Sequence, residues 1–156
     1  MARNKQTVST LFILLLAFTA STIGQEKHIE RADLPAVVQK TADEQSKGAV
    51  VRGYTAETED GKLEYEVEMI VDGHTKDVSI DPSGNILEVE EQVAMDKLPA
   101  EVRDGLQRKA GNGKIRKVES IVKRGTLVAY EAQVLTGGKR SEVQVGPDGK
   151  PLEHEE

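Results

Sequence analysis

An internal repeat constrains this chain more than any other feature of its sequence. Leu34-Pro35-Ala36 recurs 64 residues later as Leu98-Pro99-Ala100, and one inserted residue then lengthens the offset to 65, so that Tyr65-Glu66 matches Tyr130-Glu131. Further pairs at the longer offset are Gly73 and Gly138, Val78 and Val143, Pro82 and Pro147, Gly84 and Gly149, and Leu87 and Leu152. A period near 65 residues is too long for a solenoid unit and is typical of a duplicated small domain. We therefore predict two repeats, residues 33–96 and residues 97–156.

Each repeat has the pattern of one helix followed by short strands. The helix opens at the Leu-Pro pair, because proline is tolerated in the first turn of a helix, and apolar residues then recur at helical spacing. Polar and apolar residues alternate through 63–71 and 128–134, as in a half-buried strand. The other predicted strands are 50–58, 78–80 and 87–89, with counterparts at 115–122, 143–145 and around Leu152. The predicted fold class is α+β: two tandem repeats, each one helix followed by a four-stranded antiparallel β-meander, preceded by a signal peptide.

The first 24 residues have the parts of a secretory signal peptide. Arg3 and Lys5 supply positive charge, Leu11–Ala17 is apolar, and small residues precede a cleavage site after Gly24. An uncleaved anchor is the alternative, but a spanning helix needs about 20 mostly apolar residues and only about half of the uncharged span here is strongly apolar. We predict a periplasmic or secreted protein with no stable membrane span after cleavage, and a short lead at residues 25–32.

The composition of the exported chain excludes several classes of function. Without cysteine there is no disulfide framework, thiolate zinc site or catalytic cysteine. Residues 25–156 hold 19 basic and 27 acidic side chains, a net charge of −8, whereas a nucleic-acid-binding protein needs a basic surface. Tyr54, Tyr65 and Tyr130 are the only aromatic residues of this part, too few for a platform on which bases stack. Nucleic acid is therefore not an expected partner.

No catalytic, metal or cofactor motif stands out. His28, His74 and His154 are far apart and form no helical i, i+4 pair, so they predict no metal site. Gly111-Asn112-Gly113-Lys114 lacks the spacing of a phosphate-binding loop and falls in a helix-to-strand turn. Residues 81–88 lack the spaced Asp ligands of a calcium loop, although weak cation binding on an acidic face stays open. We predict no enzymatic activity, no catalytic residue and no cofactor.

One face of two predicted strands is polar and forms the candidate binding site. Glu64, Glu66 and Glu68 lie on one side of the strand 63–71, and Glu131 and Gln133 take equivalent positions in the second repeat. An antiparallel sheet that packs helices on one side leaves such a face in solvent. Carboxylates that act as acid and base need a cleft and unlike environments, so a solvated binding surface is the preferred interpretation.

The two predicted repeats differ strongly in charge. Residues 33–96 hold 5 basic and 16 acidic side chains, a net charge of −11, and residues 97–156 hold 12 basic and 9 acidic, a net charge of +3. The halves could attract each other within one chain, drive salt-sensitive self-association, or face different partners, since charge complementarity steers encounter and specificity. Independent drift of two solvated surfaces is the remaining alternative.

The sequence resembles the PepSY-like family of exported bacterial proteins, whose tandem form is related in fold to β-lactamase inhibitor protein. The resemblance is carried by the signal peptide, the paired Leu-Pro helix starts, the Tyr65-Glu66-Val67 and Tyr130-Glu131-Ala132 strands, and the stretches 76–84 and 141–149. It covers essentially all of residues 25–156. It implies an α+β tandem outside the cytoplasm with a binding or inhibitory role, often proposed toward peptidases.

Together these features predict an exported, non-enzymatic binding protein. Its unidentified partner is expected to be a protein, and to be cationic if it contacts Glu64, Glu66 and Glu68. Inhibition of a peptidase or of another envelope protein is one form of this role. The alternative is an envelope sensor of a small ligand or divalent cation that uses the acidic residues 33–96.

Overall fold

The computed structural model describes residues 26–59 and 61–156, so the predicted signal peptide, residues 1–24, lies outside the described residues. Within the described part, no helix is both long and apolar enough to cross a membrane. The elements in chain order are β1 (Lys27–Ile29), a 3-10 turn (Arg31–Asp33), α1 (Ala36–Gln45), β2 (Val50–Glu59), β3 (Lys62–Val71), β4 (His74–Ile80), β5 (Ile86–Gln92), a second 3-10 turn (Met95–Lys97), α2 (Ala100–Ala110), β6 (Lys114–Lys123), β7 (Thr126–Thr136) and β8 (Lys139–Val145).

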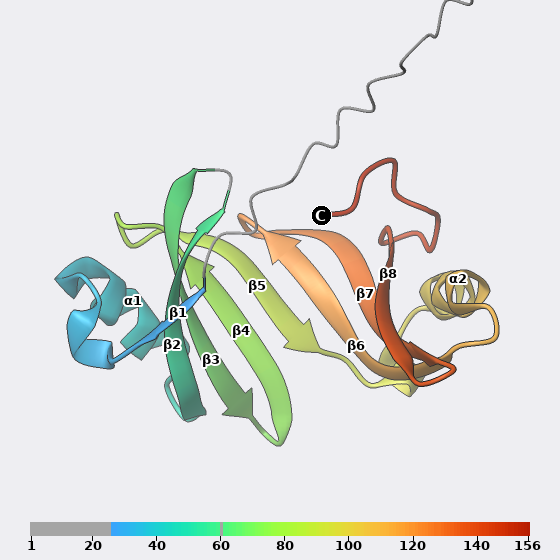
Figure 1. Ribbon diagram of the computed structural model, residues 1–156, viewed down its shortest axis with the longest axis horizontal. Coiled ribbons are helices and arrows are strands. Elements are labelled where there is room, and N and C mark those ends of the chain that lie inside the picture. The colour runs from blue at the N-terminus through green and yellow to red at the C-terminus, as the bar shows by residue number, and fades with distance from the viewer. Residues whose placement is uncertain (1–25, 60) are drawn as a thin grey trace, which may run out of the picture.

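The eight strands form one antiparallel sheet in which every strand pairs with its neighbours in the sequence (Figure 1). The central pairing is that of β5 with β6, which runs from Glu88 opposite Lys123 to Gln92 opposite Glu119. It joins the first half of the chain, residues 26–96, to the second half, residues 97–156. At one edge, β1 pairs with the middle of β2.

The predicted fold class, two tandem repeats each with one helix and a four-stranded meander, is wrong. The chain is mostly β and forms a single eight-stranded sheet with two α-helices. Four strands follow α1 but only three follow α2, because the segment around Leu152 is not a strand. Pro151 stands where Ile86 begins β5 in the first half, and proline has no backbone N–H to donate to a sheet. The lead expected to precede the fold supplies the edge strand β1.

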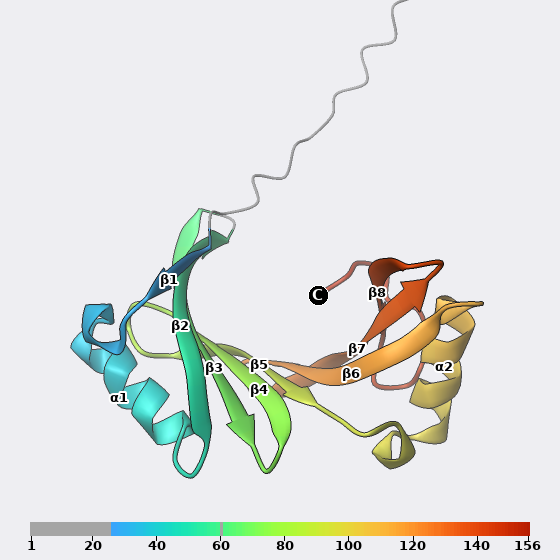
Figure 2. The same ribbon diagram turned by 60° about the horizontal axis from the view of Figure 1, so that its bottom comes forward.

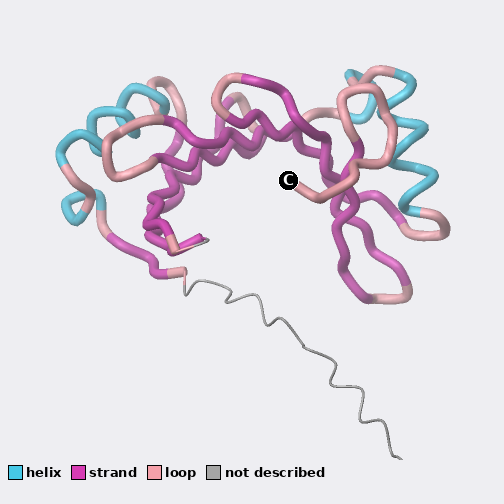
Figure 3. The backbone as a smooth tube through the Cα atoms, turned by 90° about the horizontal axis from the view of Figure 1, so that it is seen from above, coloured by secondary structure: helices cyan, strands magenta, loops and turns pink. Residues whose placement is uncertain are grey.

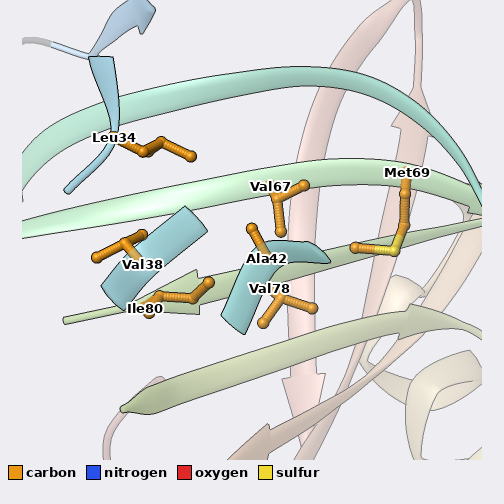
Figure 4. Close-up of a cluster of buried hydrophobic side chains, with 7 residues drawn as sticks. All are labelled: Leu34, Val38, Ala42, Val67, Met69, Val78 and Ile80. Carbon is orange, nitrogen blue, oxygen red and sulfur yellow. The ribbon is translucent and has the colours of Figure 1, made fainter. Parts of the chain in front are cut away.

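Both helices lie against the same side of the sheet, one over each end (Figure 2). Between α1 and the sheet, the buried side chains are Leu34, Val38, Ala42, Val67, Met69, Val78 and Ile80 (Figure 4). Between α2 and the sheet they are Leu98, Val102, Leu106, Val118, Ala132, Val134 and Val145. All of them are apolar and none is aromatic, so the removal of small apolar surfaces from water drives the packing of each helix.

Proline sets the start of both helices. Pro35 and Pro99 are the residues just before α1 and α2, with extended ψ angles of 145° and 146°. Their carbonyl groups accept the first helical hydrogen bonds, from the N–H of Gln39 at 2.9 Å and of Arg103 at 3.0 Å. Proline is well suited to this position because its missing N–H would have no partner within the helix.

Helix α2 meets the turn after β8 through two glycines. A Cβ on Gly105 would lie 2.2 Å from the carbonyl oxygen of Gly149, so the two backbones are in direct contact. In the first half, the hydroxyl of Thr41 donates to the carbonyl oxygen of Gly84 at 2.8 Å at the equivalent place. The second half therefore packs its helix closer to this turn than a side chain would allow.

We expect Gly105→Ala to destabilise the protein, although alanine normally favours a helix over glycine by about 1 kcal/mol. The new methyl group would overlap the Gly149 carbonyl, and overpacking of this kind costs about 1–3 kcal/mol. Thermal and urea unfolding measure the change. Gly53→Ala is the control, because the nearest atom to its Cβ would be 3.9 Å away, and equal stability of G105A and wild type would contradict the close contact.

Candidate functional site

The sheet is curved, with α1 and α2 on its convex side and a hollow on the other side (Figures 2 and 3). Successive side chains of a strand point to opposite faces. Val67 and Val78 are fully buried under α1, so Glu66, Glu68 and Asp77 point into the hollow. We call this side, which carries the even-numbered residues of β3 and the odd-numbered residues of β4, the concave face.

The structure places all five predicted site residues on the concave face, but in two groups. Glu64, Glu66 and Glu68 lie on β3, whereas Glu131 and Gln133 lie on β7. Three strands separate them in the sheet, and at a strand spacing of about 4.8 Å this puts the groups roughly 19 Å apart. They belong to one surface and not to one cluster.

The space between the two groups is filled by acidic residues that the sequence analysis missed. Asp77 on β4 is opposite Glu90 on β5, Glu88 on β5 is opposite Lys123 on β6, and Glu119 on β6 is opposite Glu131 on β7. The polar alternation of β4 and β5 was a usable signal for Asp77, Glu88 and Glu90. Glu119 had no such signal, because it lies on β6 and the sequence does not show that β6 pairs with β5.

A pocket of about 190 Å³ lies over β2 to β6 on the concave face. Its lining, which we call the acidic pocket, consists of Glu57, Glu64, Glu66, Asp77, Ser79, Glu88, Glu90, Lys123 and Glu156. Lys123 is the one basic side chain of this lining, and its Nζ lies 3.4 Å from Glu88 and 3.5 Å from Glu156. The other carboxyl groups make the lining predominantly acidic.

Crowding on a partly desolvated surface changes the protonation of these carboxylates. Burial, reinforced by the neighbouring Asp77 and Glu68, raises the pKa of Glu66 to about 7. Burial and a hydrogen bond with Glu88 raise the pKa of Glu90 to about 8. Burial also raises the pKa of Asp77 to about 6, against the opposing charge of Lys117. These groups can therefore take up or release protons near neutral pH.

Three of the carboxylates converge at the centre of the sheet. Oxygen atoms of Asp77, Glu90 and Glu119 lie within 4.8 Å of one another. Glu119 is only 4% exposed, and its carboxylate pairs with Lys117 Nζ at 2.5 Å and accepts a hydrogen bond from Thr75 Oγ1 at 3.4 Å. We call these three residues the carboxylate trio. Hard cations such as Ca²⁺ are bound by oxygen ligands of this kind.

A second group of possible ligands lies near the edge of the concave face. Glu26, His28 and Glu68 also bring ligand atoms within 4.8 Å of one another, with Glu26 and His28 exposed to solvent. The sequence analysis predicted no metal site from His28, because the histidines form no pair at ligand spacing. In the structure its neighbours are two carboxylates, Glu26 just before β1 and Glu68 on β3.

The last residues of the chain return to the concave face next to Glu131. Gln144, only 6% exposed, accepts a hydrogen bond from the backbone N–H of Glu156 at 2.8 Å and donates one to Glu131 at 2.9 Å. Figure 3 shows the C-terminal end inside the hollow of the sheet. The predicted site residue Glu131 thus helps to orient the glutamine that holds the tail.

Three solved structures with a similar fold come from Bacteroides species. A BLIP-like protein from Bacteroides fragilis has a TM-score of 0.57 and 18% identity over 76% of this chain and 83% of that chain. A candidate periplasmic protein from Bacteroides eggerthii has a TM-score of 0.63 and 16% identity over 76% and 86%. A DUF2874 family protein from Bacteroides ovatus has a TM-score of 0.60 and 19% identity over 77% and 85%. The fold is BLIP-like, and at these identities the similarity shows the fold alone.

No family model and no curated protein sequence matches the chain. The fold relationship to β-lactamase inhibitor protein, which BLIP abbreviates, is supported by the similar structures. The PepSY-like assignment is not confirmed and stays a prediction.

We expect the protein to become more stable as the pH is lowered from about 8.5 to 6. The folded state raises the pKa of Glu66, Asp77 and Glu90 above their ordinary values. It therefore binds more protons than the unfolded state in this range, and stability falls as the pH rises through these values. Melting temperatures across the range test this.

Glu90→Gln should raise the melting temperature at pH 8.5 and flatten its dependence on pH, because it removes the most strongly shifted of these carboxyls. Glu44→Gln, an exposed change on α1, is the matched control and should leave the slope as in wild type. A wild-type melting temperature that falls on acidification would contradict the account.

Proposed function

We propose that this protein is an exported, non-enzymatic binding protein that captures a cationic partner on the concave face of its sheet. The observation that carries the proposal is the acidic pocket, a pocket of about 190 Å³ whose lining includes six carboxyl groups from β2 to β5. A cationic group entering this pocket would offset the burial and the mutual repulsion that together raise the pKa values of Glu66 and Glu90. Binding would thus gain from both attraction and the relief of crowding.

A periplasmic or secreted location is part of the proposal. Its supports are the signal-like residues 1–24 and the periplasmic description of one protein of similar fold. Inhibition of an envelope peptidase is a finer form of the proposal, supported by the resemblance to PepSY-like proteins. It requires that a captured peptidase lose its activity, which a residual-activity assay would decide.

At pH 9, above the raised pKa values of Glu66, Asp77 and Glu90, we expect residues 25–156 to bind a lysine octapeptide at low salt and to release it at high salt, because screening acts strongly on exposed charges. The triple variant E66Q/D77N/E90Q should bind at least about tenfold more weakly, a change of about 1.4 kcal/mol. Calorimetry at both salt concentrations measures the affinity. Light scattering on the same samples separates binding from the salt-sensitive self-association that the charge difference between the halves also predicts.

The control is E44Q/E101Q/D104N, which removes three negative charges from exposed positions on α1 and α2. It should bind as wild type does, because these residues lie on the helices and not on the concave face. Equal losses in the two triple variants would assign the effect to net charge and refute the concave face as the binding surface.

A divalent-cation sensor is the second candidate function, and the carboxylate trio is the observation that favours it. Three carboxylates within 4.8 Å of one another match the oxygen ligands that Ca²⁺ takes, and a cation would compensate the buried charge of Glu119.

If the protein binds Ca²⁺ at the trio, millimolar calcium chloride should raise its melting temperature, since a ligand that binds only the folded state stabilises it. D77N/E90Q should abolish the increase, whereas E101Q/D104N, two exposed changes on α2, should preserve it. No increase in the wild type, or an equal increase in D77N/E90Q, would refute the sensor.

A further inference from the structure

A second pocket lies at the opposite end of the concave face and has the opposite charge. It has a volume of about 390 Å³. Its lining, which we call the arginine pocket, consists of Arg116, Gln133, Val134, Leu135, Gly138 and Arg140. Gln133 and Leu135 alternate with the buried Val134 on β7, and Arg140 is opposite Leu135 in the β7–β8 pairing. The arginine pocket therefore continues the concave face past Glu131.

The two guanidinium groups have no partner of their own. Among the residues that the structure describes, neither Arg116 nor Arg140 takes part in an ion pair or a side-chain hydrogen bond, whereas Lys117 and Lys123 pair with acidic neighbours. Arg116 and Arg140 lie on β6 and β8, two strand spacings or about 10 Å apart. Side chains as long as arginine can converge on one group across that distance, with the amide of Gln133 between them.

The local backbone explains how Arg116 comes to face this pocket. The pairing of β6 with β7 shifts by one residue between Ile115 and Lys117, so Arg116 is the extra residue of a β-bulge. A bulge locally twists a strand and changes the direction of a side chain.

The first half contains the same bulge, which provides an internal comparison. Arg52 is the extra residue between Val51 and Gly53 in the pairing of β2 with β3. At the positions equivalent to Gln133 and Arg140, however, the first half has Glu68 and Thr75. The second half thus has a second arginine and a neutral amide where the first half has a threonine and a carboxylate. Glu142, opposite Gln133, keeps the position that Asp77 has opposite Glu68.

From this geometry we infer that the arginine pocket binds a carboxylate group. Arginine presents a planar fork of N–H donors that matches the two oxygens of a carboxylate, and Gln133 adds an amide donor. The inference does not rest on the proposed function, since it concerns a different pocket and a ligand of opposite charge. It adds to that function a preference for partners that carry both a cationic group and a carboxylate. The cationic group would lie at the acidic pocket and the carboxylate at the arginine pocket.

The test uses ¹⁵N-labelled residues 25–156 and acetyl-trialanine, whose C-terminal carboxylate is its only charge, at constant ionic strength. We expect the side-chain Nε–H signals of Arg116 and Arg140 to shift to saturation. R116Q and R140Q should each weaken binding at least about tenfold, because each removes one charged fork. The same peptide with an amidated C-terminus should cause no saturable shift. Thermal unfolding confirms that the variants, altered at exposed positions, remain folded.

Arg52→Gln is the matched control, because Arg52 occupies the equivalent bulge without a second arginine. It should leave the affinity unchanged. Acetate distinguishes the source of the carboxylate: affinity equal to that of the tripeptide would indicate a small free carboxylate, and much weaker affinity would indicate a polypeptide C-terminus. Absence of a saturable shift, equal shifts with the amidated peptide, or an equal loss in R52Q would overturn the inference.

Discussion

The pairing of β5 with β6 is the interaction on which the rest of the structure depends. Each half has a helix and a modest aliphatic cluster, and each would otherwise end in an open strand edge with unpaired backbone groups. The five residue pairs from Glu88–Lys123 to Gln92–Glu119 close these edges and turn two curved pieces into one arched sheet. The ion pair of Lys123 with Glu88, 3.4 Å apart, crosses the same junction.

This junction also creates the chemistry of the concave face. Because both helices occupy the convex side, the side chains of β3, β4 and β5 that face away from them, such as Glu66, Asp77 and Glu90, lie on the concave face. Glu119 from the second half then meets Asp77 and Glu90 from the first, with oxygen atoms within 4.8 Å. Burial and crowding raise the pKa values of Glu66 and Glu90, and this costs stability at neutral pH. Proteins commonly retain such local conflicts where a surface has a binding role.

The two halves share a local design but present opposite charges at the two ends of one surface. A β-bulge with an arginine as its extra residue occurs in both, at Arg52 and at Arg116. Around it, Glu68 and Thr75 are replaced by Gln133 and Arg140, which makes this end of the surface less acidic without changing the backbone pattern, while Glu142 stays opposite Gln133. A partner that lies along the arch would therefore meet the acidic pocket at one end and two arginines at the other, a difference that favours one orientation of binding.

By itself the sequence determined the local features of this protein. The Leu-Pro pairs located both helices, and two-residue alternation assigned Glu64, Glu66, Glu68, Glu131 and Gln133 to the side of the strands opposite the helices. Periodicity carries this information because it depends only on residues close together in the chain. Only the tertiary structure decided that β5 pairs with β6, that β1 joins the edge, and that the chain leaves the sheet after Val145.

The same division holds for the candidate sites. The carboxylate trio and the arginine pocket each combine residues from separate strands, up to 42 positions apart in the case of Asp77 and Glu119. Alternation predicts which face a side chain takes but not which strand lies beside it. That choice depends on backbone hydrogen bonds between distant segments, and these form only when the whole sheet is assembled.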